Sequence, residues 1–232
     1  MKNYIHPLQE EYDLSTFTFF KSLSPDELFL LNDEKSTSQY KKGDVIYHEG
    51  KRLTGFYCIM SGVLKIIKTG SDGKEQIIRF VTKGDIIAYR SLLSKEGACT
   101  TAKVIEQAVL VHVPYNTLTS ILSTNHKFAL STLQVVCKEL KDANNYITDI
   151  AHKTVRERVA EVLIMLREKF GVDNNNILQV SLTREEIANM VGTATESVIR
   201  LLSEFKHDSI IEIKGREIKF VNLPRLTRIA NM

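Results

Sequence analysis

Residues 182–202 read LTREEIANMVGTATESVIRLL, and this stretch decides the fold of the C-terminal part of the chain. Apolar residues at helical spacing form one stripe that ends at Val191, and a second stripe runs from Val198 to Leu202. Gly192 stands between them, where glycine tolerates the left-handed conformation of a tight turn. The pattern predicts two helices joined by a short turn. Such a pair is either an ordinary helical hairpin or a helix-turn-helix, whose second helix enters the DNA major groove.

A candidate β-hairpin follows directly. Apolar and charged residues roughly alternate over residues 210–221, on either side of Lys214-Gly215-Arg216, which predicts two short strands with a basic tip. A plain exposed hairpin would have the same pattern, but its position behind the second helix favours a winged helix-turn-helix. We expect Thr193, Thr195 or both to cap that second helix.

Bulk properties favour a soluble globular protein. The chain has 232 residues, of which 43% are hydrophobic and 25% charged, and its length suggests one or two domains. The formal net charge is only +3, and residues 151–232 hold 13 basic and 11 acidic groups, so a DNA-binding surface must come from local placement of Arg and Lys. No N-terminal signal segment is present, and no apolar run approaches the roughly 18 residues of a membrane span. We therefore expect no membrane partner.

Cysteine usage points to a reducing compartment. Cys58, Cys99 and Cys137 are odd in number and widely spaced, which argues against a disulfide framework. A cytoplasmic location is expected. Three thiols also cannot supply the four ligands of an iron–sulfur cluster, so this cofactor is not expected.

The N-terminal half is expected to begin with helices and continue as a β-roll. Residues 1–35 have a mainly helical pattern, and Ser24-Pro25 is a good helix start. Short β-rich runs with turns then fill residues 40–114. Two segments have the same sequence, Lys42-Gly43-Asp44 and Lys83-Gly84-Asp85, and each places a turn before an apolar strand. This density of short strands predicts a closed roll or jelly-roll.

A long helical segment follows, and its apolar residues recur with alternating gaps of four and three. The positions are Ala129, Leu133, Val136, Leu140, Ala143, Ile147 and Ile150. This heptad seam predicts pairing with a copy of the same helix in a homodimer. The alternative is that the stripe packs on the chain's own β-roll. A further helix is expected to begin at Thr154.

The order of β-roll, dimerisation helix and winged helix resembles the Crp/Fnr family of bacterial transcription regulators. The most specific segments are Ile59–Val63 (IMSGV), Lys83-Gly84-Asp85 and the stretch quoted first. The resemblance implies an α+β fold: a double-stranded β-helix (jelly-roll) sensor domain over 1–122, a dimerisation helix over 123–153 and a winged helix-turn-helix domain over 154–232. It also implies double-stranded DNA with a pseudo-palindromic site as partner, and RNA polymerase as a further candidate partner.

The family's recognition helix reads bases with a Glu and, four residues later, an Arg, which here are Glu196 and Arg200. Arg can donate two bonds to guanine, and Glu can accept from cytosine, so the two would read a G·C pair. The alternative is that they pair with each other on a solvated helix face. Thr195 stands where the cyclic-AMP-responsive branch has an Arg, which favours a thymine methyl contact. The other expected DNA contacts are Thr183, Arg184, Thr193, Ser197, Lys214 and Arg216.

The effector side of the resemblance departs from the cyclic AMP pattern. Tyr89 occupies the position of the ribose-binding Glu, Thr100-Thr101 that of the phosphate-binding Arg-Ser pair, and Asn144 follows Ala143 where the hydroxyls that meet the base would stand. A buried phosphate without its Arg lacks a compensating charge, so cyclic AMP is not expected. Arg90 stands one residue after Tyr89, displaced by one position from the family pattern. The expected pocket for an unidentified effector consists of Tyr89, Arg90, Ser91, Thr100, Thr101, Leu140 and Asn144.

Other function classes receive less support. His48, His112, His126 and His152 leave haem open as an effector, although none lies in a discriminating motif. A metal-dependent β-roll enzyme would need a tight His-x-His cluster, and the six His are scattered, so neither catalysis nor a metal site is expected. A sensor module that acts only through protein partners is the third class. Because the predicted winged helix can bind DNA itself, action through protein partners alone is not needed to explain the sequence.

Overall fold

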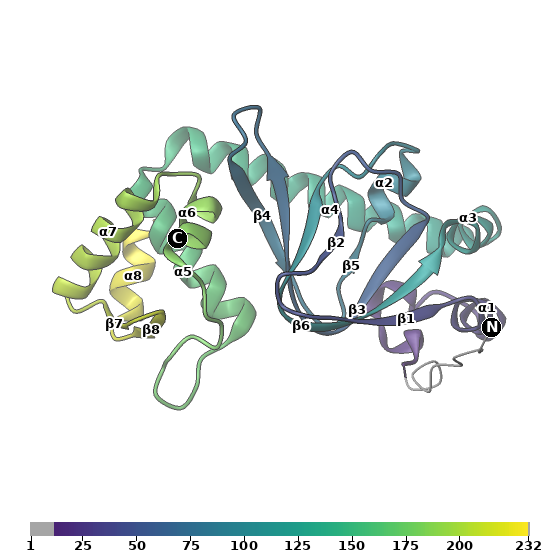
Figure 1. The fold of residues 1–232 in the computed structure, drawn as a ribbon, viewed down its shortest axis with the longest axis horizontal. Coiled ribbons are helices and arrows are strands. Elements are labelled where there is room, and N and C mark those ends of the chain that lie inside the picture. Colours follow the sequence, from purple (N-terminus) through teal and green to yellow (C-terminus); the bar gives the residue numbers. More distant parts are fainter. Residues whose placement is uncertain (1–11, 232) are drawn as a thin grey trace. The chain divides into compact units, whose positions relative to one another are not determined.

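Two long antiparallel strands organise the N-terminal part of the protein, as Figure 1 shows. In this computed structural model, which describes residues 12–231, β3 (Gly55–Thr69) pairs with β6 (Thr101–Pro114). The shorter strands add to them: β1 (Ser36–Tyr40) and β2 (Val45–Tyr47) pair with β6, and β4 (Glu75–Val81) and β5 (Ile86–Ile87) pair with β3. The predicted β-roll is confirmed.

Consecutive residues of the long strands face two different cores. Cys58 of β3 and Val111 of β6 belong to a cluster shared with the flanking helices, whereas Ile59 and Leu110 belong to a cluster formed mainly by the strands. All four are at most 1% exposed. Because a strand sends alternate side chains to opposite faces, burial on both faces explains why these strands read as nearly continuous apolar runs.

Gly62 allows the long strands to change register. Its φ is +87°, and a Cβ there would lie 2.3 Å from the carbonyl oxygen of Gln107. The β3–β6 register shifts on both sides of this position, between Ser61 and Val63 and at the neighbouring pairs. Only glycine suits such a close approach at positive φ, which accounts for the glycine of the IMSGV segment.

Short helices cover one face of the sheet. They are η1 (Leu14–Thr16), η2 (Thr18–Phe20), α1 (Pro25–Asp33), α2 (Tyr89–Leu93) and α3 (Tyr115–Thr124). The predicted start at Ser24 is confirmed, because its hydroxyl accepts from the backbone N–H of Glu27 and the Glu27 carboxylate accepts from Ser24 N–H. The helical pattern of residues 1–11 lies outside the described residues.

The long helix α4 (His126–His152) has one buried and one exposed apolar face. Phe128 at its start is fully buried among the rings of Phe19 and Phe20. The heptad seam is instead open to solvent: Leu133 is 56% and Leu140 61% exposed. Val136 of the seam is half-buried and packs against the core of the roll, so the alternative that the stripe packs on the chain's own roll holds for this residue. It is wrong for Leu133 and Leu140, whose exposed apolar side chains need another partner.

The C-terminal part is a winged helix-turn-helix, as predicted. It consists of α5 (Val155–Phe170), α6 (Arg184–Val191), α7 (Thr195–His207), the hairpin β7 (Ile211–Lys214) and β8 (Glu217–Phe220), and α8 (Leu223–Ile229). Gly192 ends α6 at φ 72° and ψ 50°, the expected left-handed turn. The expectation of a threonine cap on α7 is wrong: Ala194 is the N-cap, and no side chain bonds to the first turn.

The chain divides into two compact units, one up to Leu140 and one from Lys141. The secondary structure changes from roll to long helix between α3 and α4, and from α4 to the C-terminal helices at Thr154, which caps α5 in a box with Glu157. The predicted boundary at 153 coincides with the end of α4, whereas the one at 122 falls within the last turn of α3. The three-part division stays a prediction.

Candidate nucleic-acid interface and sensor interior

The first turns of α7 present polar side chains to solvent. Glu196 and Arg200 are both exposed and stand four residues apart, on one helix face. No ion pair joins these two residues, both of which belong to the described part of the chain. The alternative that they neutralise each other is therefore not supported, and the carboxylate and the guanidinium are both available to a partner. Ser197 and Thr195 are half-buried beside them.

Thr183 and Arg184 at the start of α6 already have partners inside the protein. The Thr183 hydroxyl accepts a hydrogen bond from Glu186 N–H at 3.0 Å, which caps α6. Arg184 Nη2 donates to the carbonyl oxygen of Gly215 at 2.8 Å, joining α6 to the hairpin turn. Burial lowers the pKa of Arg184. Both residues therefore shape the surface itself, in addition to any contact with a partner.

The tip of the β7–β8 hairpin carries the two basic residues expected there. Lys214 and Arg216 are exposed on either side of Gly215, whose φ is +58°. Lys214 pairs across the hairpin with Glu217 in the backbone register. Thr193 lies in the turn before α7 and its N–H donates to Ala188 O at 3.2 Å. The tip, the turn and the exposed face of α7 belong to one structural unit.

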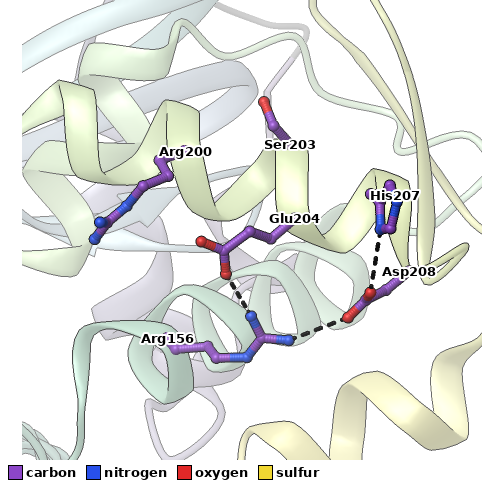
Figure 2. A pocket seen from close by; sticks show the side chains of 6 residues that line it. All are labelled: Arg156, Arg200, Ser203, Glu204, His207 and Asp208. Atoms are coloured by element: carbon purple, nitrogen blue, oxygen red, sulfur yellow. Dashed lines mark hydrogen bonds and ion pairs between the residues drawn. The ribbon is translucent and has the colours of Figure 1, made fainter.

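An ion-pair cluster fixes the later turns of α7. Figure 2 shows Arg156 of α5 between Glu204 and Asp208, while the Arg200 side chain extends separately. The Arg156 guanidinium nitrogens lie 2.6 Å from the Glu204 carboxylate and 3.4 Å from the Asp208 carboxylate. The Arg156 guanidinium also lies 4.9 Å from the ring centroid of Phe205. These groups border a surface cavity of about 410 Å³. No local sequence pattern predicts this cluster, because its members come from α5 and from the end of α7.

Side chains fill the interior of the roll around Tyr89. Tyr89 is 1% exposed, and with Arg90, Ser91 and Thr100 it encloses a space of only about 10 Å³. Burial, and then the nearby Glu139 carboxylate, raise the pKa of Tyr89, so the phenol stays neutral. A space of this size is close to the smallest that holds one water molecule.

Glu139 of α4 joins two arginines of the roll. Its carboxylate accepts from Arg79 Nη1 of β4 at 2.8 Å and lies 3.1 Å from Arg90 Nε of α2. Sequence reasoning singled out Arg90 but missed Arg79 and Glu139. No local sequence signal was available for them, because Arg79, Arg90 and Glu139 lie on three different elements.

The remaining predicted effector residues do not line this interior space. The Thr101 hydroxyl accepts from Glu49 N–H at 2.9 Å, and Leu140 and Asn144 are exposed. The structure therefore brings Tyr89, Arg90, Ser91 and Thr100 together and leaves the other three outside.

The candidate haem ligands are dispersed. His48, His126 and His152 are exposed, and His112 is half-buried against the Tyr57 ring. Within residues 12–231, no group of three or more His, Cys, Asp or Glu side chains is arranged to hold a metal ion. None of the helices in that range combines the length and apolar character needed to cross a membrane.

A β-roll followed by a long helix and a winged helix with an open, polar α7 defines a DNA-binding regulator with a sensor domain. Comparisons agree: residues 37–125 match the cyclic nucleotide-binding domain, and residues 157–229 match the Crp-like helix-turn-helix domain. The chain belongs to the Crp/Fnr family of transcription regulators.

Relatives resemble the chain over most of its length. It is 27% identical to the CRP-like cAMP-activated global transcriptional regulator of Mycobacterium tuberculosis, over 91% of this chain and 95% of that one. The chain is 26% identical to the Electron transport regulator A of Shewanella oneidensis, over 90% of this chain and 84% of that one. The structure of FixK2 from Bradyrhizobium japonicum matches with a TM-score of 0.75 and 25% identity, over 84% of this chain and 96% of that one.

Proposed function

We propose that this protein is a homodimeric regulator that inserts α7 of each copy into the major groove of a pseudo-palindromic DNA site. The observation that carries the proposal is the exposed, unpaired state of Glu196 and Arg200 on one face of α7. Arg200 would donate to guanine O6 and N7, and Glu196 would accept from the cytosine amino group. Half-sites about one helical turn apart would follow from the two-fold symmetry.

The other polar residues of this surface position the protein on the DNA. Thr195 is proposed to contact a thymine methyl group, and Ser197 and Thr193 a phosphate or base edge. Lys214 and Arg216 at the hairpin tip, with Thr183 and Arg184, would contact the phosphate backbone. Backbone contacts fix register and orientation, whereas base contacts set the sequence preference.

The exposed seam of α4 is proposed to form the dimer. Leu133, Leu140, Ile147 and Ile150 are 45–64% exposed, and pairing with a second α4 would bury them. The sensor domain would bias this pairing. Through the segment around Ala151–Val155 it would then bias the orientation of the two reading helices.

The input signal is proposed to differ from cyclic AMP, although one relative is named as cAMP-activated. Tyr89 fills the interior of the roll, and the positions for the ribose-binding Glu and phosphate-binding Arg hold other residues. We propose that the protein works in the cytoplasm by binding alone, without a catalytic step. RNA polymerase is a candidate partner at promoters that it activates.

Selection of bound DNA from a random pool, with and without cell extract, tests the proposal. We expect a two-fold symmetric consensus with a G·C pair in each half-site, bound in a strongly salt-dependent manner. The same selection with Arg200→Ala should lose the preference at that pair only. A pool that yields no consensus in either condition contradicts the proposal.

A further inference from the structure

The C-terminal part of α4, from Lys141 onward, belongs to the same compact unit as the helix-turn-helix. Most of its side chains are exposed. Between Lys141 and Ile150, a stretch that the structure describes completely, only Tyr146 and Asp149 are partly covered. These two residues stand three positions apart and so share one face of the helix. This covered face is where α4 contacts the rest of the unit.

Tyr146 bonds directly to helix α6. Its hydroxyl donates to the carbonyl oxygen of Met190 at 3.3 Å, in the last turn of α6. The last four carbonyl groups of an α-helix have no N–H partner within that helix, so the Tyr146 hydroxyl supplies a donor that α6 itself cannot. Met190 is only 5% exposed. The bond therefore joins the long helix to the first helix of the helix-turn-helix.

Two further sets of contacts hold the junction between α4 and α5. Lys153 Nζ lies 3.0 Å from the Asp149 carboxylate of α4 and 2.9 Å from the Glu161 carboxylate of α5. The Lys153 side chain is 19% exposed, so salt screens these ion pairs less than pairs on an open surface. Arg158 of α5 donates to the carbonyl oxygen of Ile150 at 3.0 Å, again in the last turn of a helix.

Three side chains thus connect the end of α4 to α5 and α6, and we call them the brace: Tyr146, Lys153 and Arg158. The reading helix α7 follows α6 directly after the tight turn at Gly192. Any shift of α6 relative to α4 therefore moves α7 as well. The brace fixes the angle between the long helix and the reading helix within one chain.

The same part of α4 carries residues of the proposed dimer seam. Ile147, next to Tyr146, is 64% exposed, and Ile150 is 45% exposed. In the proposed dimer, this part of α4 contacts the partner chain on one face and its own α5 and α6 on another. Because the dimer is two-fold symmetric, the angle between α4 and α7 sets the distance and the rotation between the two reading helices.

We propose that Tyr146 is a positioning residue that determines which half-site spacing the dimer accepts. This inference rests on the proposed function. Tyr146 acts through α6 and not on the DNA itself. Loss of its hydroxyl leaves each reading helix intact but lets the two helices vary in distance and rotation. Selectivity for spacing then relaxes, whereas the base preference within each half-site stays.

Competition binding to sites of altered spacing tests the proposal. The probes are the selected site and the same site with one base pair inserted or removed at its centre, which rotates the half-sites by about 35° relative to each other. The measured quantity is the affinity for the selected site divided by the affinity for each altered site. Tyr146→Phe should lower this ratio at least threefold and keep the G·C preference of each half-site.

Thr148→Val is the matched control. It removes a hydroxyl from the same helix, but the bond of that hydroxyl to Asn144 O lies within α4, so the spacing ratio should stay that of the parent. Lys153→Gln breaks both ion pairs of the brace and should lower the ratio, and it decides the matter if Tyr146→Phe does not fold. An unchanged ratio in Tyr146→Phe overturns the proposal, even where all sites lose affinity equally, because a uniform loss indicates a bond that only stabilises the fold.

A distance measurement without DNA follows the same geometry. A nitroxide label on Ser203→Cys, at an exposed position of α7, gives one label per chain when Cys99 and Cys137 are replaced by Ser and Cys58 stays buried. Double electron–electron resonance then measures the distance between the two labels of a dimer. The distribution should be broader in Tyr146→Phe than in the parent. Equal widths overturn the proposal.

The two experiments separate this inference from the proposed function. A distribution that broadens in Tyr146→Phe, in a protein that binds no DNA site, contradicts the proposed function alone. DNA binding with the same spacing selectivity in Tyr146→Phe and in the parent contradicts the positioning role alone.

Discussion

Arg156 Nη1 of α5 lies 2.6 Å from Glu204 Oε2 of α7, and this ion pair anchors the later turns of the candidate recognition helix. Asp208, one turn further on, is shared between Arg156 and Arg225 of α8. Arg200 stands one turn before Glu204 and takes no part in this cluster. The protein thus fixes one end of α7 with internal charges and leaves the other end open for DNA.

Arg200→Ala should cost about 1–3 kcal/mol of binding free energy at the selected site and relax selectivity at one base pair. The reason is the loss of a two-bond contact to guanine. Competition binding against sites mutated one pair at a time measures both effects. Lys214→Ala is the matched control, since loss of a phosphate contact weakens all sequences alike. The same uniform loss with Arg200→Ala would contradict its base-reading role.

Thr183→Ala should lower the free energy of unfolding by about 1 kcal/mol, because the hydroxyl caps α6. Thr183→Asn retains a capping oxygen and should restore most of this stability. Urea denaturation measures the effect, and DNA affinity is measured beside it. If the Asn variant is stable and still binds weakly, Thr183 also contacts the phosphate backbone. If Ala and parent unfold alike, the cap contributes nothing.

Leu140→Lys should dissociate the dimer without unfolding the chain. Leu140 is 61% exposed within one chain, so a lysine there disturbs no internal core, but it places two like charges in the paired seam. Sedimentation velocity measures the mass, and circular dichroism checks the helices. Gln134→Lys, an exposed position off the seam, should stay dimeric. A dimeric Leu140→Lys protein would show that the interface lies elsewhere.

Stability should fall in alkaline solution partly because of Tyr47. Burial raises the pKa of this phenol to about 12, above its ordinary value of 10.0. Between these values the unfolded chain loses the proton and the folded chain keeps it, so each pH unit favours unfolding by up to about 1.4 kcal/mol. Below pH 10 the effect is absent. Denaturation of Tyr47→Phe from pH 9 to 11.5 should show a flatter decline than the parent, with Tyr115→Phe as a control that follows the parent.

Cyclic AMP should give no saturable heat in calorimetry at millimolar concentration. Tyr89 occupies the interior of the roll and leaves about 10 Å³, so a nucleotide would have to displace a buried ring. Its phosphate would also meet Thr100 in place of an Arg. Tight, stoichiometric binding would disprove this reading of the interior.

Local signals made much of the fold predictable. The cap at Ser24, the turn at Gly192 and the hairpin around Gly215 each depend on residues a few positions apart, and all three were predicted correctly. The prediction of a threonine cap on α7 was wrong. Two threonines flank Ala194, and spacing alone does not say which residue adopts the N-cap conformation.

Long-range contacts could not be predicted in the same way. Glu139 meets Arg79 and Arg90 across sixty and forty-nine residues of chain, and no periodicity connects the three. Each is an ordinary charged residue in its own segment. Only the pairing of β3 with β4 and the packing of α2 bring the two arginines to one helix.

The division of β3 and β6 between two cores has a consequence for engineering this protein. Removing one residue from the middle of β3 would exchange the contents of both cores at once, so deletions there should be lethal to the fold. The turn at Gly70–Gly73 between β3 and β4 includes exposed residues and lies outside both cores. A fluorescent reporter or an affinity peptide inserted at that turn would leave both faces of the long strands in place.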